Sequence, residues 1–224
     1  MANIYVVSTP IGNLKDITLR AIETLKSSEL IVCEDTRVSG TLLAHFGIKS
    51  KLTSLNEFNE EVKSHQILNQ IEKLENVSLI SDAGTPLLSD PGYKFIKRAG
   101  ELGHKIIPIP GASALLSALV VSGLPTNAFT YLGFLPKSSS KQIKIFEQYK
   151  NQNHTLIIFE SPHRVIKTLQ TIQSVFGDIN MSICRELTKK FEQISNLPIS
   201  THMGKFETKK PKGEFTLVLN PKEN

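Results

Sequence analysis

Short apolar runs alternate, along the first half of the chain, with longer segments in which apolar residues recur every three or four positions. The runs show no polar alternation, which is typical of strands buried on both faces of a parallel sheet. The longer segments have the spacing of amphipathic helices. The first half is therefore predicted to be an α/β unit with a mostly parallel sheet. Its predicted strands are 4–7, 30–33, 52–55, 77–80 and 105–109, and its predicted helices are 14–25, 41–46, 62–74, 92–102 and 112–122.

The second half of the chain loses this regular alternation towards its end. The last two predicted strands are not separated by a clear helical pattern, so a mixed sheet is expected there. Between the halves, the segment 122–128 (SGLPTNA) combines Gly, Pro and polar residues and is predicted to be a linker between domains 1–121 and 129–224. The second domain has predicted strands at 130–134, 155–159, 180–184, 190–194 and 215–219 and predicted helices at 141–149 and 165–176.

The composition is ordinary for a globular protein, since 40% of the 224 residues are hydrophobic and 21% are charged. The two cysteines, Cys33 and Cys184, lie in strand-like apolar runs and are expected to be buried thiols in a reducing compartment. No apolar run approaches membrane-spanning length, and the N-terminus lacks the pattern of a signal peptide. The cytoplasm is therefore the expected compartment.

The positive charge is unevenly distributed. Residues 1–128 hold 12 Lys and Arg against 13 Asp and Glu, whereas residues 129–224 hold 14 against 8. An excess confined to one half is compatible with a polyanionic partner such as nucleic acid. A lysine-rich solvated surface explains the same excess, so charge alone leaves both interpretations open.

Loops rich in Gly, Pro, Ser, Thr and Asp follow three of the predicted strands of the first half. They are 8–13 (STPIGN), 81–92 (SDAGTPLLSDPG) and 108–113 (PIPGAS). Because the carboxyl ends of parallel strands meet at one edge of a sheet, these loops are expected to form one ligand site. The chain has no G-x-G-x-x-G turn and no Walker A sequence, so hydride transfer and P-loop phosphoryl transfer are poorly supported.

Single residues in these loops have two interpretations each. Asp82 directly follows a strand and can accept a hydrogen bond from a ligand or cap the turn after it. Asp90 precedes a predicted helix and is expected to cap it. Ser113 lies in the first turn of the helix predicted at 112–122, where unpaired backbone N–H groups can bind an anion. Pro10 and Gly12, taken alone, are ordinary turn residues.

Charged residues also follow other predicted strands. In CEDTR (33–37), a general base or a substrate clamp competes with a simple ion pair. FESPHR (159–164) and RELTKK (185–190) supply groups that can hold phosphates, or alternatively form a solvated edge with Arg–Glu pairs. The chain has no G-x-S-x-G, H-E-x-x-H or C-x-x-C motif, so a hydrolase or a metalloenzyme has no positive support.

The motifs taken together are far more specific than any one of them. The chain contains, in this order, STPIGNLKDITLRAIETLK, CEDTR, SDAGTPLLSDPGY, PIPGASALLSAL, GLP, GFLP, FESPHR, RELTK and KGEFTLVL. From Ile4 to about Leu219 it closely resembles the ribosomal RNA 2′-O-ribose methyltransferase I branch of the tetrapyrrole (corrin/porphyrin) methylase superfamily.

The resemblance implies a two-domain tetrapyrrole-methylase-like α/β fold, a homodimer, and S-adenosylmethionine bound in the cleft between the domains. It implies methyl transfer to the ribose 2′-hydroxyl of a decoding-region cytidine in 16S rRNA of the small ribosomal subunit. The cofactor brings its own positive charge, so no metal is expected. Cofactor contacts are implied at Pro10, Ile11, Gly12, Asp82, Gly84, Thr85, Ser113, Ala114, Phe159, Glu160, Glu214 and Phe215.

Charge type and strand-end position suggest which residues act on the substrate. Asp35 and Glu186 are candidate proton acceptors for the 2′-hydroxyl. The predicted phosphate contacts are Arg37, Arg164, Arg185 and Lys189.

Two departures from the superfamily pattern bear on the substrate. Tetrapyrrole-modifying members carry a Gly-rich first loop, whereas STPIGN is similar to the RNA branch and favours RNA. Many members of that branch continue into a helical extension that is expected to aid RNA binding, whereas this sequence stops five residues after Leu219. The alternatives are a tetrapyrrole methylase, disfavoured by the basic second half, and an inactive cofactor-binding module, disfavoured by the strand-end acids.

Overall fold

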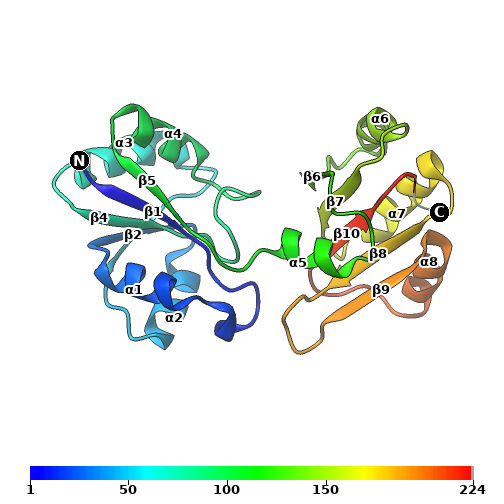
Figure 1. Ribbon diagram of the computed structural model, residues 1–224, viewed down its shortest axis with the longest axis horizontal. Coiled ribbons are helices and arrows are strands. Elements are labelled where there is room, and N and C mark those ends of the chain that lie inside the picture. The colour runs from blue at the N-terminus through cyan, green and yellow to red at the C-terminus, as the bar shows by residue number, and fades with distance from the viewer. Residues whose placement is uncertain (223–224) are drawn as a thin grey trace. The chain divides into compact units, whose positions relative to one another are not determined.

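The computed structural model describes residues 1–222, and the chain forms two compact units, Met1–Ser113 and Ala114–Asn224. Each unit is built on its own five-stranded sheet, as Figure 1 shows. Each sheet also has its own clusters of buried apolar residues. The two units are described in turn.

Unit 1 contains a parallel sheet with the strand order β3-β2-β4-β1-β5. Helices connect its strands, as the continuous apolar runs predicted. The elements are β1 Asn3–Val7, the 3₁₀ turn η1 Leu14–Asp16, α1 Leu19–Ser27, β2 Leu30–Cys33, α2 Thr36–His45, β3 Lys51–Ser54, α3 Glu60–Ile71, β4 Asn76–Leu79, α4 Tyr93–Glu101 and β5 Lys105–Ile109.

The sheet of unit 1 is buried on both faces. Ala21 and Leu25 of α1 pack with Leu43 of α2 in one apolar cluster. Ile67 of α3 and Phe95 of α4 belong to another cluster. Figure 1 shows these helix pairs on opposite sides of the strands. This double cover explains why the strands carry no polar alternation.

Unit 2 contains a mixed sheet with the order β6-β7-β10-β8-β9. β6 and β7 are parallel, whereas β10 is antiparallel to both of its neighbours and β9 is antiparallel to β8. The mixed sheet was predicted. The elements are α5 Ala114–Val121, β6 Phe129–Phe134, α6 Ser139–Tyr149, β7 Thr155–Glu160, α7 Val165–Phe176, β8 Asn180–Arg185, β9 Gln193–Pro198, α8 Ile199–Thr208 and β10 Phe215–Leu219.

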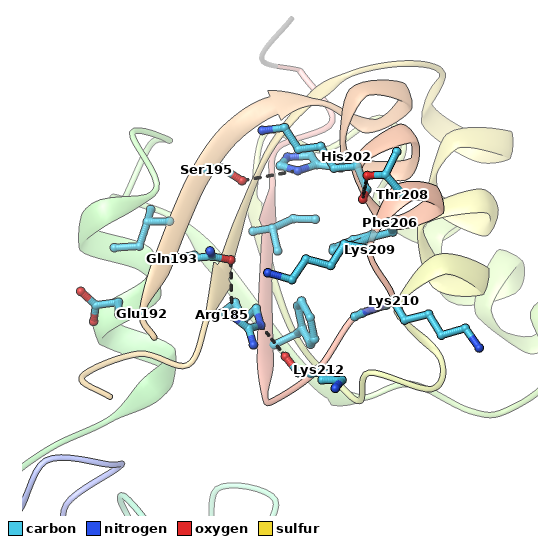
Figure 2. A pocket seen from close by; sticks show the side chains of 15 residues that line it. Arg185, Glu192, Gln193, Ser195, His202, Phe206, Thr208, Lys209, Lys210 and Lys212 are labelled. Atoms are coloured by element: carbon cyan, nitrogen blue, oxygen red, sulfur yellow. Dashed lines mark hydrogen bonds between the residues drawn. The ribbon is translucent and has the colours of Figure 1, made fainter. Parts of the chain in front are cut away.

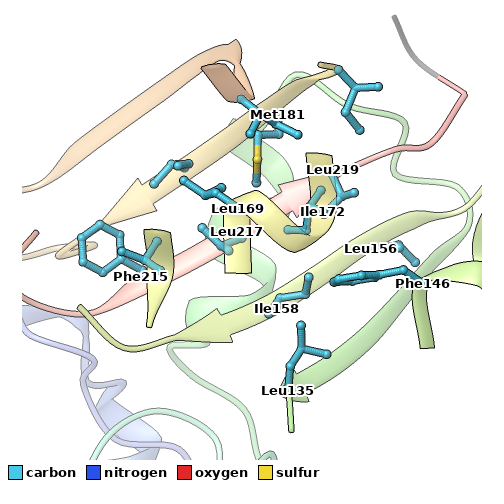
Figure 3. Packing of buried hydrophobic residues seen from close by; sticks show 14 of the residues in the cluster. Leu135, Phe146, Leu156, Ile158, Leu169, Ile172, Met181, Phe215, Leu217 and Leu219 are labelled. Atoms are coloured by element: carbon cyan, nitrogen blue, oxygen red, sulfur yellow. The ribbon is translucent and has the colours of Figure 1, made fainter. Parts of the chain in front are cut away.

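The core of unit 2 lies between this sheet and its helices, as Figure 3 shows. All five residues of the central strand β10 are buried. Phe146 of α6 is fully buried and meets the ring of Phe176 edge-on, at 5.6 Å between centroids. Leu169 and Ile172 of α7 fill the same cluster. This apolar layer supports the strand ends that carry the charged motifs.

Helix α8 was missed by the sequence prediction, which found no clear helix before the last strand. Its sequence, ISTHMGKFET, contains Ser, Thr and Gly, which favour a helix only weakly. Packing stabilises it instead, because Ile199 and His202 are buried and Met203 and Phe206 pack against the core. The strand predicted at 190–194 lies at Gln193–Pro198, since the preceding residues form a turn.

Helix α2 is longer than predicted, because it begins at Thr36 and not at residue 41. The Asp35 carboxylate caps it by accepting a hydrogen bond from the Arg37 backbone N–H at 2.8 Å. The capped start lies immediately after β2, so CEDTR is a strand-to-helix turn.

The boundary between the compact units lies at Ser113 and Ala114. Helix α5 therefore groups with unit 2, where it contacts β10. The sequence placed α5 in the first domain and the linker at 122–128, and that assignment of domain limits stays a prediction.

Cys33 and Cys184 are buried free thiols, as predicted. Among residues 1–222, no helix combines the length and apolar character needed to cross a membrane.

The packing of unit 2 predicts a large effect of Phe146→Ala. Removing this buried ring leaves a cavity and should lower the free energy of unfolding by about 3–5 kcal/mol, measured by urea denaturation. Ile143→Ala on the same helix is the matched control, since Ile143 is 37% exposed and should change stability by less than about 1 kcal/mol. Equal effects of the two substitutions would contradict this packing.

Candidate functional site

Three loops of unit 1 are joined by hydrogen bonds at the carboxyl edge of its sheet. The Thr9 N–H donates to the Gly84 carbonyl at 2.8 Å, and the Gly84 N–H donates back to the Thr9 carbonyl at 3.0 Å. The Thr85 hydroxyl lies 3.0 Å from the Ser8 hydroxyl and donates to the Ala112 carbonyl at 3.1 Å. The loops after β1, β4 and β5 are therefore one connected surface, as their strand-end positions predicted.

Gly84 packs closely against the loop after β1. Its φ of +83° is in the left-handed region that favours glycine. A Cβ at this position would lie 3.1 Å from the Ile11 side chain, and Ile11 itself is buried. The backbone of the 81–92 loop therefore packs directly against the Ile11 side chain of the loop after β1.

The strand order predicts where unit 1 would bind a ligand. β1 and β4 are neighbours, but the chain leaves β1 through α1 and leaves β4 through α4, which cover opposite faces. Loops that diverge from adjacent parallel strands open a crevice at the carboxyl edge, where open α/β sheets bind their ligands.

Acidic side chains gather beside these loops. The Asp82 carboxylate accepts a hydrogen bond from the Asp35 backbone N–H at 3.1 Å, which ties the loop after β4 to the loop after β2. Burial raises the pKa of Asp82. Burial also raises the pKa of Glu34, and the charges of Asp82 and Asp90 raise it further. A cation bound here would relieve both the desolvation and the mutual repulsion.

Asp35 differs from the other acids of this group. It pairs with Arg37 at 2.6 Å, and the hydrogen bonds from Arg37 lower the pKa of Asp35 to about 2. The Arg37 side chain is 89% exposed, so the pair lies at the surface. Asp35 is thus an ionised helix cap, and its guanidinium partner is open to solvent.

The prediction that Asp90 caps the following helix is wrong. The N-cap of α4 is Gly92, and it has no side-chain cap bond. The Glu60 carboxylate accepts from the Gly92 N–H at 3.1 Å and from the Lys94 N–H at 2.8 Å, so a residue of α3 covers this helix end. Asp90 is instead half-buried, and its burial raises its pKa to about 6 despite a hydrogen bond with Ser81.

The loop around Asp90 is conformationally strained. Leu87 and Ser89 adopt φ values of 74° and 71°, in the region that non-glycine residues rarely occupy. Such strain is concentrated at functional sites, where the surrounding structure maintains it.

In unit 2, three of the charged motifs meet at one edge of the mixed sheet. Phe215, the first residue of β10, pairs with Glu160 at the end of β7 and with Arg185 at the end of β8. FESPHR, RELTK and KGEF therefore lie side by side. The ring of Phe159 contacts Tyr131 and Phe134 of β6.

Glu160 and Arg164 are engaged with each other and with nearby backbone. The Glu160 carboxylate is fully buried, accepts from the Thr168 hydroxyl at 2.6 Å and lies 3.3 Å from the Arg164 guanidinium. Arg164 also donates to the Leu135 carbonyl at 2.5 Å. This network fixes the loop after β6 to the start of α7.

Glu186 holds the start of β10. Its carboxylate accepts from the Glu214 N–H at 3.0 Å and pairs with Lys189 at 3.1 Å, and these contacts lower its pKa. Gly213 packs so closely that a Cβ there would lie 2.6 Å from the Glu186 side chain. Glu186 itself has a φ of 53°, so RELTK is a second strained strand-end turn.

The remaining predicted site residues lie at the same two edges. Pro10 is buried and Gly12 is exposed in the loop after β1. Ser113 closes unit 1 and Ala114 begins α5. Residues 1–222 hold no cluster of three or more His, Cys, Asp and Glu side chains arranged to bind a metal. Sequence reasoning missed the part that Glu34 and Asp90 take in the acidic group, although both lie within the motifs.

Comparison with known proteins identifies the family of the chain. The family model for Tetrapyrrole (Corrin/Porphyrin) Methylases matches residues 3–201. The chain is 43% identical to a "Ribosomal RNA small subunit methyltransferase I" of Halalkalibacterium halodurans, over 96% of this chain and 75% of the relative. It is 40% identical to the protein of that name from Thermotoga maritima, over 100% of both chains.

Solved structures share the fold at low sequence identity. A diphthine synthase superposes with a TM-score of 0.78 at 14% identity, covering 98% of this chain and 90% of that one. A uroporphyrin-III-C-methyltransferase from Thermus thermophilus gives 0.65 at 17% identity, covering 97% and 94%. The family model and these relatives extend over most of the chain, which belongs to the tetrapyrrole (corrin/porphyrin) methylase family.

Proposed function

We propose that this protein transfers a methyl group from S-adenosylmethionine to the ribose 2′-hydroxyl of a cytidine in the decoding region of 16S rRNA. The observation that carries the proposal is the similarity, at 40–43% identity and across 96–100% of the chain, to small-subunit ribosomal RNA methyltransferases of distant bacteria. The unequal charge of the two halves supports it, because residues 129–224 hold 14 cationic against 8 acidic residues.

The residues of unit 1 fit the cofactor of this family. S-adenosylmethionine supplies an activated methyl group on a positively charged sulfur and also carries an ammonium group. Burial raises the pKa values of Glu34, Asp82 and Asp90, and the charge of Asp82 raises those of Glu34 and Asp90 further. A cationic ligand is therefore favoured beside them. The proposed contacts of unit 1 are Pro10, Ile11, Gly12, Asp82, Gly84, Thr85 and Ser113. Those of unit 2 are Ala114, Phe159, Glu160, Glu214 and Phe215.

The protein's contribution to the reaction is to position the ribose and to accept its proton. We propose Asp35 and Glu186 as the candidate acceptors. Both are ionised at neutral pH, because hydrogen bonds from neighbouring groups lower their pKa values. Each lies on a strand-end turn, where the backbone holds the carboxylate in place.

The side chains of the proposed phosphate contacts differ in their exposure to solvent and in the partners that they already bind. The Arg37 guanidinium is 89% exposed and pairs only at one side with Asp35. Lys189 bridges Glu186 and Glu214, and Arg164 is bound to Glu160 and to the Leu135 carbonyl. Arg37 is therefore the strongest candidate, whereas Arg164, Arg185 and Lys189 are engaged by neighbouring groups and would act partly by fixing the loops. A homodimer and a cytoplasmic location belong to the same proposal.

The proposed activity predicts label transfer to RNA. With radiolabelled S-adenosylmethionine, 30S subunits or 16S rRNA should become labelled at a ribose, and uroporphyrinogen should not. Label in uroporphyrinogen alone would contradict the proposal and favour a tetrapyrrole methylase. A chain that binds S-adenosylmethionine but labels neither acceptor would be a binding module.

The acceptor assignment predicts that Asp35→Asn or Glu186→Gln slows methyl transfer by about 10²–10⁴-fold with unchanged S-adenosylmethionine affinity. Asn still caps α2, so the fold is preserved. Glu101→Gln, at an exposed position of α4, is the control and should keep the wild-type rate. Two variants that both retain the full rate would exclude both residues as acceptors.

The lowered pKa values also predict the pH profile. Since Asp35 and Glu186 ionise well below neutrality, the rate constant at saturating substrates should be constant between about pH 6 and pH 8. Asp90, whose pKa is about 6, would instead give a rate that rises with pH through that value. Such a rise, if abolished by Asp90→Asn, would transfer the acceptor role to Asp90.

A further inference from the structure

Unit 2 contains a cavity of about 650 Å³. Of the predicted site residues, only Arg185 and Phe215 line it. Figure 2 shows it as a groove between strands β8 and β9, helix α8 and the loop that joins α8 to β10. We call it the basic groove. It is lined by Ile183, Arg185, Glu192, Gln193, Ile194, Ser195, His202, Lys205, Phe206, Thr208, Lys209, Lys210, Pro211, Lys212 and Phe215.

The lining of the basic groove is dominated by one sign of charge. It holds Arg185 and four lysines, at 205, 209, 210 and 212, against the single carboxylate of Glu192. Within residues 1–222, none of these four lysines forms an ion pair, whereas the neighbouring Lys189 pairs with two glutamates. Cations that are concentrated in a cleft and left unpaired create a strong local potential for anions.

Arg185 joins the two walls of the groove. The Arg185 guanidinium donates to the Lys212 carbonyl on one wall and to the Phe191 carbonyl, at 3.3 Å, and Gln193, at 3.4 Å, on the other. Figure 2 shows this side chain between the two walls. Arg185 also ends β8, where it pairs with Phe215. The basic groove therefore begins at the strand-end edge of unit 2 and leads away from it.

The floor of the groove is apolar and contributes no further charge. Ile183 and Phe215 are buried beneath it. His202 is also buried, and its ring contacts the Met181 carbonyl at 3.1 Å and the Ser195 hydroxyl at 3.5 Å. Burial lowers the pKa of His202, and the nearby Lys205 lowers it further, so this ring is neutral at physiological pH. The positive charge thus lies along the rim, on flexible side chains.

We propose that the basic groove binds the phosphodiester backbone of the RNA substrate and guides the strand to the neighbouring edge of unit 2. Its identity as an rRNA site rests on the proposed function. Four unpaired lysines spread over a helix and a loop suit a chain of phosphates, since a single small anion would engage only one or two of them. A concave surface suits a strand, whereas a lipid surface is contacted by convex faces with protruding apolar residues.

The test is charge reversal at Lys209 and Lys210, compared with charge reversal at Lys141 and Lys144. All four lysines are exposed in unit 2, and the second pair lies on α6, outside the groove. Lys209→Glu with Lys210→Glu should weaken binding of 16S rRNA about tenfold or more, and should reduce the slope of log affinity against log salt by about 2, near one for each lost phosphate contact. The α6 pair should change both quantities far less.

Three further measurements locate the defect. S-adenosylmethionine affinity and the unfolding temperature should be unchanged in the groove variant. In the methylation assay its KM for RNA should rise while kcat is retained. An unchanged salt slope, or an equal loss in the α6 variant, would overturn the proposal, because the effect would then be absent or would follow net charge alone.

The same variants test whether the groove binds another polyanion instead of RNA. They also distinguish failure of the groove proposal from failure of the proposed function. Phosphatidylglycerol vesicles and polyglutamate are the competing probes, and a groove-dependent loss of either with RNA binding intact would overturn the proposal. Wild-type protein that labels no RNA would refute the proposed function, yet a groove-dependent loss of RNA binding would still support the groove. If the wild-type protein methylates RNA and the groove variant binds RNA with full affinity, the proposal for the groove is refuted and the proposed function is not.

Discussion

The reciprocal hydrogen bonds between Thr9 and Gly84 are the constraint on which the arrangement of unit 1 depends. They join loops that leave adjacent strands toward opposite faces of the sheet, and they place Ile11 against the glycine backbone. The Ser8–Thr85–Ala112 contacts extend the connection to the loop after β5. With these loops fixed, the half-buried carboxylates of Glu34, Asp82 and Asp90 are held at the carboxyl edge of the sheet, and this combination suits a cationic cofactor better than an anionic one.

In unit 2, buried or partly buried ion pairs fix the strand-end loops. Glu160 and Glu186 are each bound by several donors, and each holds a neighbouring loop in place. Glycine is favoured at 213, because its φ is +90° and a Cβ there would lie 2.6 Å from the Glu186 side chain. Four lysines that form no ion pair within residues 1–222 line the basic groove instead. Paired charges therefore build the edge, and unpaired charges remain available for a polyanion.

The sequence predicted the elements whose signals are local. Continuous apolar runs predicted the parallel sheet, and the rule for strand ends predicted that the loops at 8–13, 81–92 and 108–113 lie together. Helix α8 escaped prediction because tertiary packing, and not propensity, stabilises it. Asp90 was assigned as a cap because the true partner, Glu60, lies 32 residues from Gly92 in the chain. The basic groove needed the structure as well, since Arg185 and the lysines at 205–212 are separated in sequence by β9.

The central claim is that the connected loops of unit 1 form the S-adenosylmethionine site, and Gly84→Ala tests it most directly. Gly84 and Gly47 both have positive φ, at 83° and 65°, but a Cβ at Gly47 meets nothing within 4 Å. The two alanine variants therefore share the backbone strain, of about 1–2 kcal/mol, and differ in the contact with Ile11. Calorimetric titration should show S-adenosylmethionine binding weakened about tenfold or more in Gly84→Ala and near wild type in Gly47→Ala, whereas a folded Gly84→Ala variant with wild-type affinity would contradict the account.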